Sequence, residues 1–144
     1  MLQLFNAVSE NCSRIVAEKY SSSFYSAIRL LHKDMRAPVF NIYGFVRFAD
    51  EIVDTFHEHD KESLLLQFKK ETYDAIERGI SLNPILNSFQ LTVNEYNIHR
   101  GLIDAFFQSM EFDLSKKLLK SQPGKYILDR PFTSSFRSRR KFTF

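Results

Sequence analysis

A long apolar helix, predicted from about residue 36 to 57, sets the architecture of this chain. Gly44 is the only helix-weakening residue after Pro38 in that stretch. Apolar residues cover most of the helix circumference: Ile42, Phe45, Val46, Phe48, Ala49, Ile52, Val53 and Phe56. A helix that is apolar on so many sides is buried on most of them, so we expect other helices to surround it.

The rest of the chain also favours helices. Glycine and proline contribute only 4 residues each to the 144, which argues against a turn-rich β-sandwich or barrel. No stretch shows the apolar alternation of a strand. Further helices are predicted at about 4–16, 24–31, 61–78, 84–96 and 101–114. Asp60 and Gly79 mark the two ends of the third of these, and Asn83 precedes the fourth. The apolar side of the first consists of Leu4, Val8, Cys12, Ile15 and Val16, and that of the last consists of Leu102, Ile103, Phe106, Phe107 and Met110. Asp34 is the expected cap of the long helix. The predicted fold class is an all-α helical bundle.

The charge of the chain divides near residue 115. Residues 1–114 contain 11 Lys and Arg against 16 Asp and Glu, whereas residues 115–144 contain 9 basic residues against the single acid Asp129. The second segment shows no apolar period and is interrupted by Pro123 and Pro131. We therefore expect a helical domain over 1–114 and a basic, poorly ordered tail over 115–144.

Four polar residues form one stripe along the long helix. At 100° per residue, Tyr43, Arg47, Asp50 and Asp54 fall within a sector of about 60°. Two carboxylates one turn apart repel each other, and Arg47 neutralises only one of them. Mg²⁺ is commonly held by one or two carboxylates, water and substrate phosphates, so the stripe indicates a metal and diphosphate site. The competing interpretation is a solvated polar face.

Weaker signals lie outside this stripe. Ser21 and Ser23, at the start of a helix, either cap it or hold an anion on its free amides. The sequence His57-Glu58-His59 suggests zinc only faintly, and a surface turn is the better interpretation. Cys12, the single cysteine, is interpreted as a core thiol and excludes an internal disulfide.

Three segments together resemble the squalene/phytoene synthase family. They are YSSSFY at 20–25, LL at 30–31 and IYGFVRFADEIVD at 42–54, and their order and spacing agree with the family. The similarity is strongest to the bacterial phytoene synthase branch. It continues weakly through NPI at 83–85 to MEFDL at 110–114, so it covers about residues 5–114.

The resemblance implies an isoprenoid synthase fold, of which this chain is the N-terminal part. It also implies a head-to-head condensation of two prenyl diphosphates, farnesyl or geranylgeranyl diphosphate, with Mg²⁺ in isoprenoid and carotenoid biosynthesis. Asp50 and Asp54 are then the first metal-binding pair, and Tyr43 and Arg47 line the diphosphate site. Ser21 and Ser23 lie at its phosphate-binding edge. Tyr20 stands where some relatives carry a basic residue, which leaves its role open.

The chain departs from the family after Leu114. The family carries a second aspartate-rich motif, and no second Asp-x-x-x-Asp follows residue 54 here. This predicts a truncated or frame-shifted gene product with little or no synthase activity. The alternative is a half-enzyme that requires a complementary chain or self-association.

A different class of function also stays open for the tail. Aromatic and basic residues alternate there: Phe132, Phe136, Arg137, Arg139, Arg140, Lys141, Phe142 and Phe144. Such a pattern suits an adaptor that binds an anionic membrane or, less favoured, nucleic acid. No apolar run has the length of a membrane span and the N-terminus lacks a secretory signal, so we expect a cytoplasmic protein that associates at most with the membrane surface.

Overall fold

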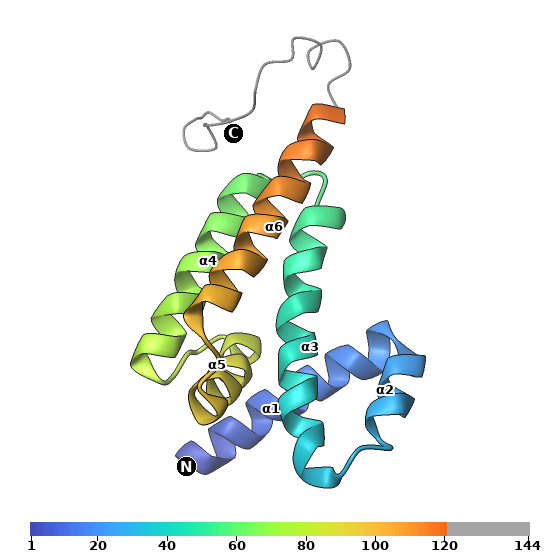
Figure 1. The fold of residues 1–144 in the computed structure, drawn as a ribbon, viewed down its shortest axis with the longest axis vertical. Coiled ribbons are helices and arrows are strands. Elements are labelled where there is room, and N and C mark those ends of the chain that lie inside the picture. Colours follow the sequence, from blue (N-terminus) through green and yellow to red (C-terminus); the bar gives the residue numbers. More distant parts are fainter. Residues whose placement is uncertain (121–144) are drawn as a thin grey trace.

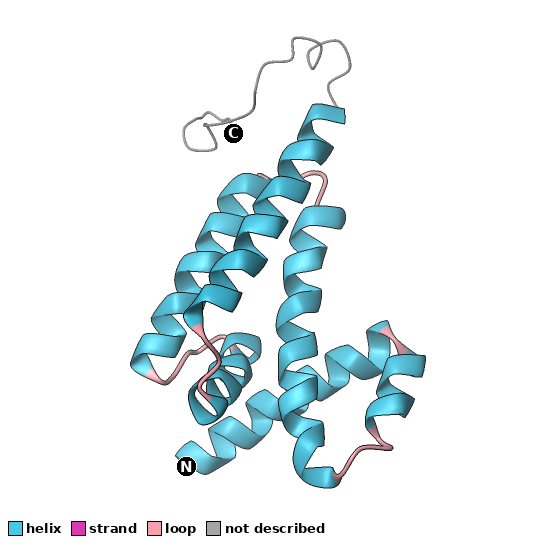
Figure 2. Ribbon diagram, viewed as in Figure 1, coloured by secondary structure: helices cyan, strands magenta, loops and turns pink. Residues whose placement is uncertain are grey.

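The computed structural model describes residues 1–120, and these residues fold into six helices without a strand (Figures 1 and 2). The helices are α1 Leu2–Tyr20, α2 Ser22–Ile28, α3 Lys33–Asp54, α4 Lys61–Arg78, α5 Pro84–Tyr96 and α6 Arg100–Lys120. The predicted all-α class is confirmed. The predictions about order and binding in the tail fall almost entirely outside the described residues.

Local capping signals explain where several helices begin and end. The Asp60 side chain accepts a hydrogen bond from the Ser63 amide at the start of α4, and Asn83 accepts from two amides at the start of α5. Gly79 ends α4 with a φ of 76°, a left-handed conformation that glycine adopts without a Cβ clash. These three boundaries agree with the sequence analysis because each depends on neighbouring residues only.

Helix α3 is the central element of the molecule. Figure 1 shows α4 and α6 beside its C-terminal part, whereas α1, α2 and α5 pack around its N-terminal part. Phe45, in the middle of α3, is only 2% exposed. Its ring stacks on Phe89 of α5 at 3.8 Å between centroids and lies 5.4 Å from the ring of Phe68 on α4. The predicted burial of α3 by surrounding helices is therefore confirmed, although Ile42 is exposed and Phe56 lies, also exposed, beyond the end of the helix.

The contact between α1 and its neighbours is polar and close. Ser13 on α1 shares a 2.5 Å hydrogen bond with Ser88 on α5. Ser13 also faces Gly44, where a Cβ atom would lie 2.9 Å from the Ser13 oxygen. The Asn87 amide donates to Asn6 and Ser9 on α1. Small and hydrogen-bonding side chains thus form this buried seam.

The predicted apolar side of the first helix is wrong for Leu4, Val8 and Ile15, whereas Val16 is buried as predicted. Leu4 and Val8 are 57% and 52% exposed, and Ile15 is also exposed. The buried face consists of Ser9, Ser13, Val16 and Ala17. Cys12, for which a place in the core was predicted, is only partly buried. Close approach of α1 to α3 requires small side chains, and this requirement outweighs the hydrophobicity of the other face.

Several predicted details of the other helices also differ. His32, and not Asp34, caps α3 by accepting a hydrogen bond from the Asp34 amide. Helix α3 ends at Asp54, so His57 lies in an exposed turn before α4, as the surface-turn interpretation of its segment expected. Leu102 on α6 is exposed. Helix α6 continues beyond Leu114 to Lys120, so the basic segment begins inside a helix.

None of the helices within residues 1–120 combines the length and apolar character needed to cross a membrane.

Candidate functional site

Helix α3 carries the predicted stripe, and the contacts of each member differ. Tyr43, nearest the N-terminal part, stacks on Phe24 of α2 with 4.6 Å between ring centroids. Its neighbour along the stripe, Arg47, lies over the ring of Tyr20 at the end of α1, at 4.7 Å from the ring centre. These contacts bring the beginning of α2 and the end of α1 against the stripe.

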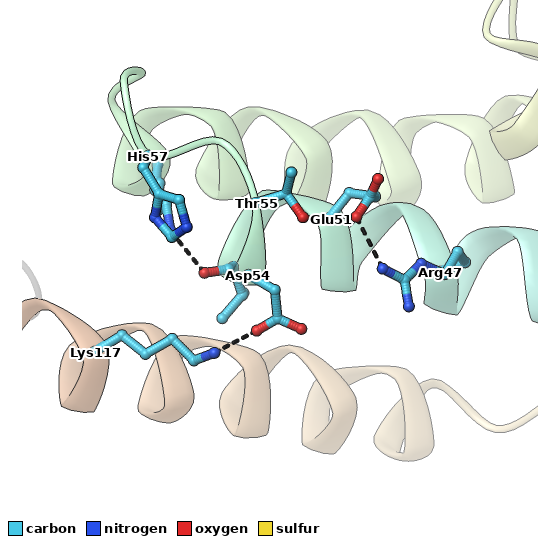
Figure 3. Close-up of polar contacts among 8 residues, drawn as sticks. Arg47, Glu51, Asp54, Thr55, His57 and Lys117 are labelled. Carbon is cyan, nitrogen blue, oxygen red and sulfur yellow. Dashed lines mark hydrogen bonds and ion pairs between the residues drawn. The ribbon is translucent and has the colours of Figure 1, made fainter. Parts of the chain in front are cut away.

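Glu51 is the main partner of Arg47. The Arg47 Nη2 donates to Glu51 Oε1 at 2.8 Å, one turn along α3 (Figure 3). Glu51 also accepts from the Tyr20 hydroxyl at 2.6 Å and from the Thr55 hydroxyl at 2.8 Å. The hydrogen bonds from Tyr20, Arg47 and Thr55 lower the pKa of Glu51 to about 2. Glu51 is therefore a carboxylate that stays ionised through its donors.

Asp50 has the opposite environment. Among residues 1–120, no side chain forms a hydrogen bond or ion pair with its partly buried carboxylate. Burial, followed by the negative charge of Asp54, raises the pKa of Asp50, while Arg47 acts in the opposite direction. Asp113 on α6 adds a further raising effect. The Asp50 carboxylate is thus partly desolvated and close to other carboxylates, and its charged form would gain from a nearby cation.

Asp54 ends α3 and points toward α6, where it pairs with Lys117 (Figure 3). The last carbonyl groups of a helix carry partial negative charge, which adds to the charge of a carboxylate at that position. Lys61 donates to the Val53 carbonyl at 2.8 Å and so satisfies one of these groups. Burial, together with the charge of Lys117, lowers the pKa of Lys61. Two ammonium groups therefore gather at the acidic end of α3.

The serine residues have a structural use in this conformation. The Ser21 side chain accepts a hydrogen bond from the Phe24 amide, which makes it the N-cap of α2. Ser23 is exposed in the first turn of the same helix. Ser21 follows Tyr20 directly, so the cap lies next to the residue that contacts Arg47. The capping interpretation of Ser21 is confirmed, and an anion at Ser21 and Ser23 stays a prediction.

Two contacts at this site could not be predicted from the sequence. Lys117 reaches Asp54 across 63 positions of sequence, and Tyr20 reaches Glu51 across 31 positions. No local periodicity connects residues so distant, because their contact depends on how α1 and α6 pack against α3. The only available signals were the helical spacing of Asp113 and Lys117 and the position of Tyr20 before the serine triplet.

The stripe has the composition of a cation and phosphate site. Mg²⁺ takes one or two carboxylates with water and phosphate oxygens, and Asp50 and Asp54 fit this pattern. Within residues 1–120, no group of three or more His, Cys, Asp or Glu side chains is close enough to hold a metal alone. A ligand phosphate would therefore have to supply part of the coordination.

Comparison with known proteins gives one consistent family. The family model for squalene/phytoene synthase matches residues 17–134. A presqualene diphosphate synthase of Rhodopseudomonas palustris is 31% identical over 108 residues, which cover 75% of this chain and 38% of that protein. A phytoene synthase of Cereibacter sphaeroides is 30% identical over 118 residues, which cover 76% of this chain and 32% of that protein.

The chain thus spans between about a third and two fifths of the length of these curated relatives. No solved structure matches it significantly. The family match covers most of the chain and includes the whole of α3, where the acidic stripe lies. On these grounds the chain belongs to the squalene/phytoene synthase family.

Proposed function

We propose that this chain carries the first metal and diphosphate site of a prenyltransferase of the phytoene and squalene synthase type. The substrate class is a prenyl diphosphate, farnesyl or geranylgeranyl diphosphate, and the cofactor is Mg²⁺. The observation that carries the proposal is the Asp50 carboxylate, which is partly buried, one turn from Asp54, and unpaired among the described residues. Membership in the family supports the substrate class.

Asp50 and Asp54 would hold the metal in this site, and Arg47 would contact the phosphates. Bound Mg²⁺ would neutralise charge on the diphosphate and so assist its departure as a leaving group. Arg47 can form charge-assisted hydrogen bonds to phosphate oxygens. Tyr43 and Phe24 place two stacked aromatic rings beside the stripe.

Ser21 and Ser23 would lie at the phosphate-binding edge in this proposal. Tyr20, which immediately precedes Ser21, contacts Arg47, so a phosphate at Arg47 would be near the start of α2. The Ser21 hydroxyl accepts a hydrogen bond from the Phe24 amide through its oxygen and keeps its proton available as a donor.

We further propose that the 144-residue chain by itself has little or no synthase activity. A head-to-head condensation handles two diphosphates, and the described residues offer one carboxylate pair on α3. The measurement is product analysis after incubation of the purified chain with farnesyl or geranylgeranyl diphosphate and Mg²⁺. Formation of phytoene or presqualene diphosphate at a rate above background would contradict this part of the proposal.

The site itself is tested by calorimetry with farnesyl thiodiphosphate, which resists hydrolysis. We expect binding that requires Mg²⁺ and that is lost in the Asp50→Asn/Asp54→Asn double variant. The matched control is Asp34→Asn/Asp74→Asn, which removes the same charge from α3 and α4 outside the stripe. Circular dichroism confirms that each variant is folded. Equal binding by both double variants would refute the assignment of Asp50 and Asp54.

A further inference from the structure

Tyr20 contacts Arg47 directly through its ring and indirectly through Glu51. Its ring lies under the Arg47 guanidinium at 4.7 Å, and its hydroxyl donates to Glu51 at 2.6 Å. Glu51 in turn accepts from Arg47. Tyr20, Glu51 and Arg47 therefore form a closed set of contacts between the end of α1 and the middle of α3.

Glu51 uses both carboxylate oxygens within this set. Oε1 accepts from Arg47 and from Thr55, and Oε2 accepts from Tyr20. The Glu51 side chain is only 16% exposed. Hydrogen bonds to Arg47, Thr55 and Tyr20 thus occupy the Glu51 carboxylate. In contrast, Asp50 has no such partner among the described residues, and Asp54 pairs with Lys117 of another helix. Glu51 therefore has a different task from the two aspartates.

The orientation of the Arg47 guanidinium is fixed by these two neighbours. The Tyr20 ring covers one side of the guanidinium, whose central carbon lies 4.7 Å from the ring centre, and Glu51 accepts a hydrogen bond from the Nη2 group. The Arg47 Nε atom is buried and finds no acceptor among the described residues. The Arg47 side chain as a whole is 28% exposed, so part of it stays accessible to an anion while the Nε donor is still unsatisfied.

We infer that Tyr20 and Glu51 are positioning residues that hold the Arg47 guanidinium in place for the diphosphate before the ligand arrives. This inference rests on the proposed function for the identity of the anion. The clamp, defined as Tyr20, Glu51 and their contacts to Arg47, exists in the free chain. It reduces the conformational freedom that Arg47 loses on binding, which tightens the complex without a direct contact from Tyr20 or Glu51 to the ligand.

The clamp is tested first without a ligand. In a ¹H–¹⁵N spectrum of arginine side chains in the full chain, Arg47→Lys identifies the Arg47 Nε–H signal and Arg78→Lys identifies an exposed reference. We expect the Arg47 signal to exchange slowly with water and to carry a ring-current shift from Tyr20. Tyr20→Phe should keep the ring-current shift but speed the exchange, whereas Tyr20→Leu should abolish the shift. An Arg47 signal that behaves like that of Arg78 in the unaltered chain would overturn the inference.

A double-mutant cycle then tests the effect on binding. Glu51→Gln should weaken Mg²⁺-dependent binding of farnesyl thiodiphosphate by about fivefold to twentyfold in the unaltered chain, and by less than about twofold in the Arg47→Lys background. Glu71→Gln on α4 is the control, because Glu71 contacts Gln67 and not the site. An equal effect of Glu51→Gln in both backgrounds would refute the clamp.

The two experiments separate the failure of the clamp from the failure of the proposed function. An immobilised Arg47 in a chain that binds no thiodiphosphate would leave the clamp standing and refute the diphosphate site. Binding that persists with a freely moving Arg47 would refute the clamp and leave the proposed function standing. Urea unfolding of each variant shows whether a loss of binding comes from a loss of folded protein.

Discussion

Replacing Gly44 by alanine should destabilise this protein, although alanine is the better helix former. Gly44 faces Ser13 where α3 crosses α1. A Cβ atom at position 44 would lie 2.9 Å from the Ser13 oxygen, 3.2 Å from its Cβ and 3.3 Å from its Cα. The Ser13 hydroxyl is held by its 2.5 Å hydrogen bond to Ser88. Rotation of the Ser13 side chain would move only the oxygen, so α1 itself must shift.

The expected magnitude follows from three contributions. Alanine in place of glycine within a helix stabilises by about 1 kcal/mol. Forcing an extra methyl group into a well-packed interface costs about 1–3 kcal/mol. Loss of the hydrogen bond between Ser13 and Ser88 costs about 1 kcal/mol more. The net effect of Gly44→Ala is therefore a decrease in the free energy of unfolding of about 1–3 kcal/mol.

Urea unfolding followed by circular dichroism measures this change. Gly101→Ala is the matched control, since its new methyl group would meet only the exposed side chain of His99, and we expect a change of less than about 1 kcal/mol there. Ser13→Gly should recover part of the loss when combined with Gly44→Ala, because it removes the Oγ and Cβ contacts. A Gly44→Ala variant as stable as the unaltered chain would refute the close-packing argument.

The same variant should also disturb the site. Helix α1 carries Ser13 in its interior and Tyr20 at its end, so a shift of α1 away from α3 moves the Tyr20 ring relative to Arg47. The Arg47 Nε–H signal should then lose part of its ring-current shift. A destabilised Gly44→Ala variant with an unchanged Arg47 signal would show that the two ends of α1 move independently.

Three further outcomes are expected. Lys117→Met should tighten Mg²⁺ binding by about twofold to fivefold, because the Lys117 ammonium no longer competes with the metal at Asp54. Calorimetry at low salt measures this affinity, and unchanged or weaker Mg²⁺ binding would contradict the prediction. Asp60→Ala should lower the free energy of unfolding by about 1 kcal/mol through loss of the α4 cap, and Asp60→Asn should restore most of it. Burial and the hydrogen bond to Asp104 raise the pKa of Tyr73 from 10.0 to about 12. The stability advantage of the unaltered chain over Tyr73→Phe should therefore be complete below about pH 10 and should decline between about pH 10 and 12. A stability advantage that grows over this range would contradict the prediction.

Features set by neighbouring residues were predictable from the amino-acid sequence alone. Asp60, Gly79 and Asn83 mark the helix ends because a cap bonds to amides or carbonyls only a few residues away. The burial of α3 followed from its apolar circumference, since such a helix has few sides that tolerate water. The placement of Arg47, Asp50 and Asp54 on successive turns of that helix required only its period.

Tertiary structure alone decided which face of α1 is buried and what each polar side chain contacts. Hydrophobicity alone favours burial of Leu4 and Val8, yet Ser9 and Ser13 are the residues buried in the core. Hydrophobicity predicts that a helix has a buried side, but the seam with Gly44 accepts only small side chains.

The site shows the same division between local and distant information. The two aspartates share one helix and one stripe, whereas their surroundings differ because different helices reach them. Lys117 arrives from α6 at Asp54, and Tyr20 arrives from α1 at Glu51. Helical periodicity determines which residues of one helix are neighbours. The partner from another helix depends on the packing of the whole chain, and that packing brings Tyr20 to Glu51 and Lys117 to Asp54 and leaves Asp50 unpaired among the described residues.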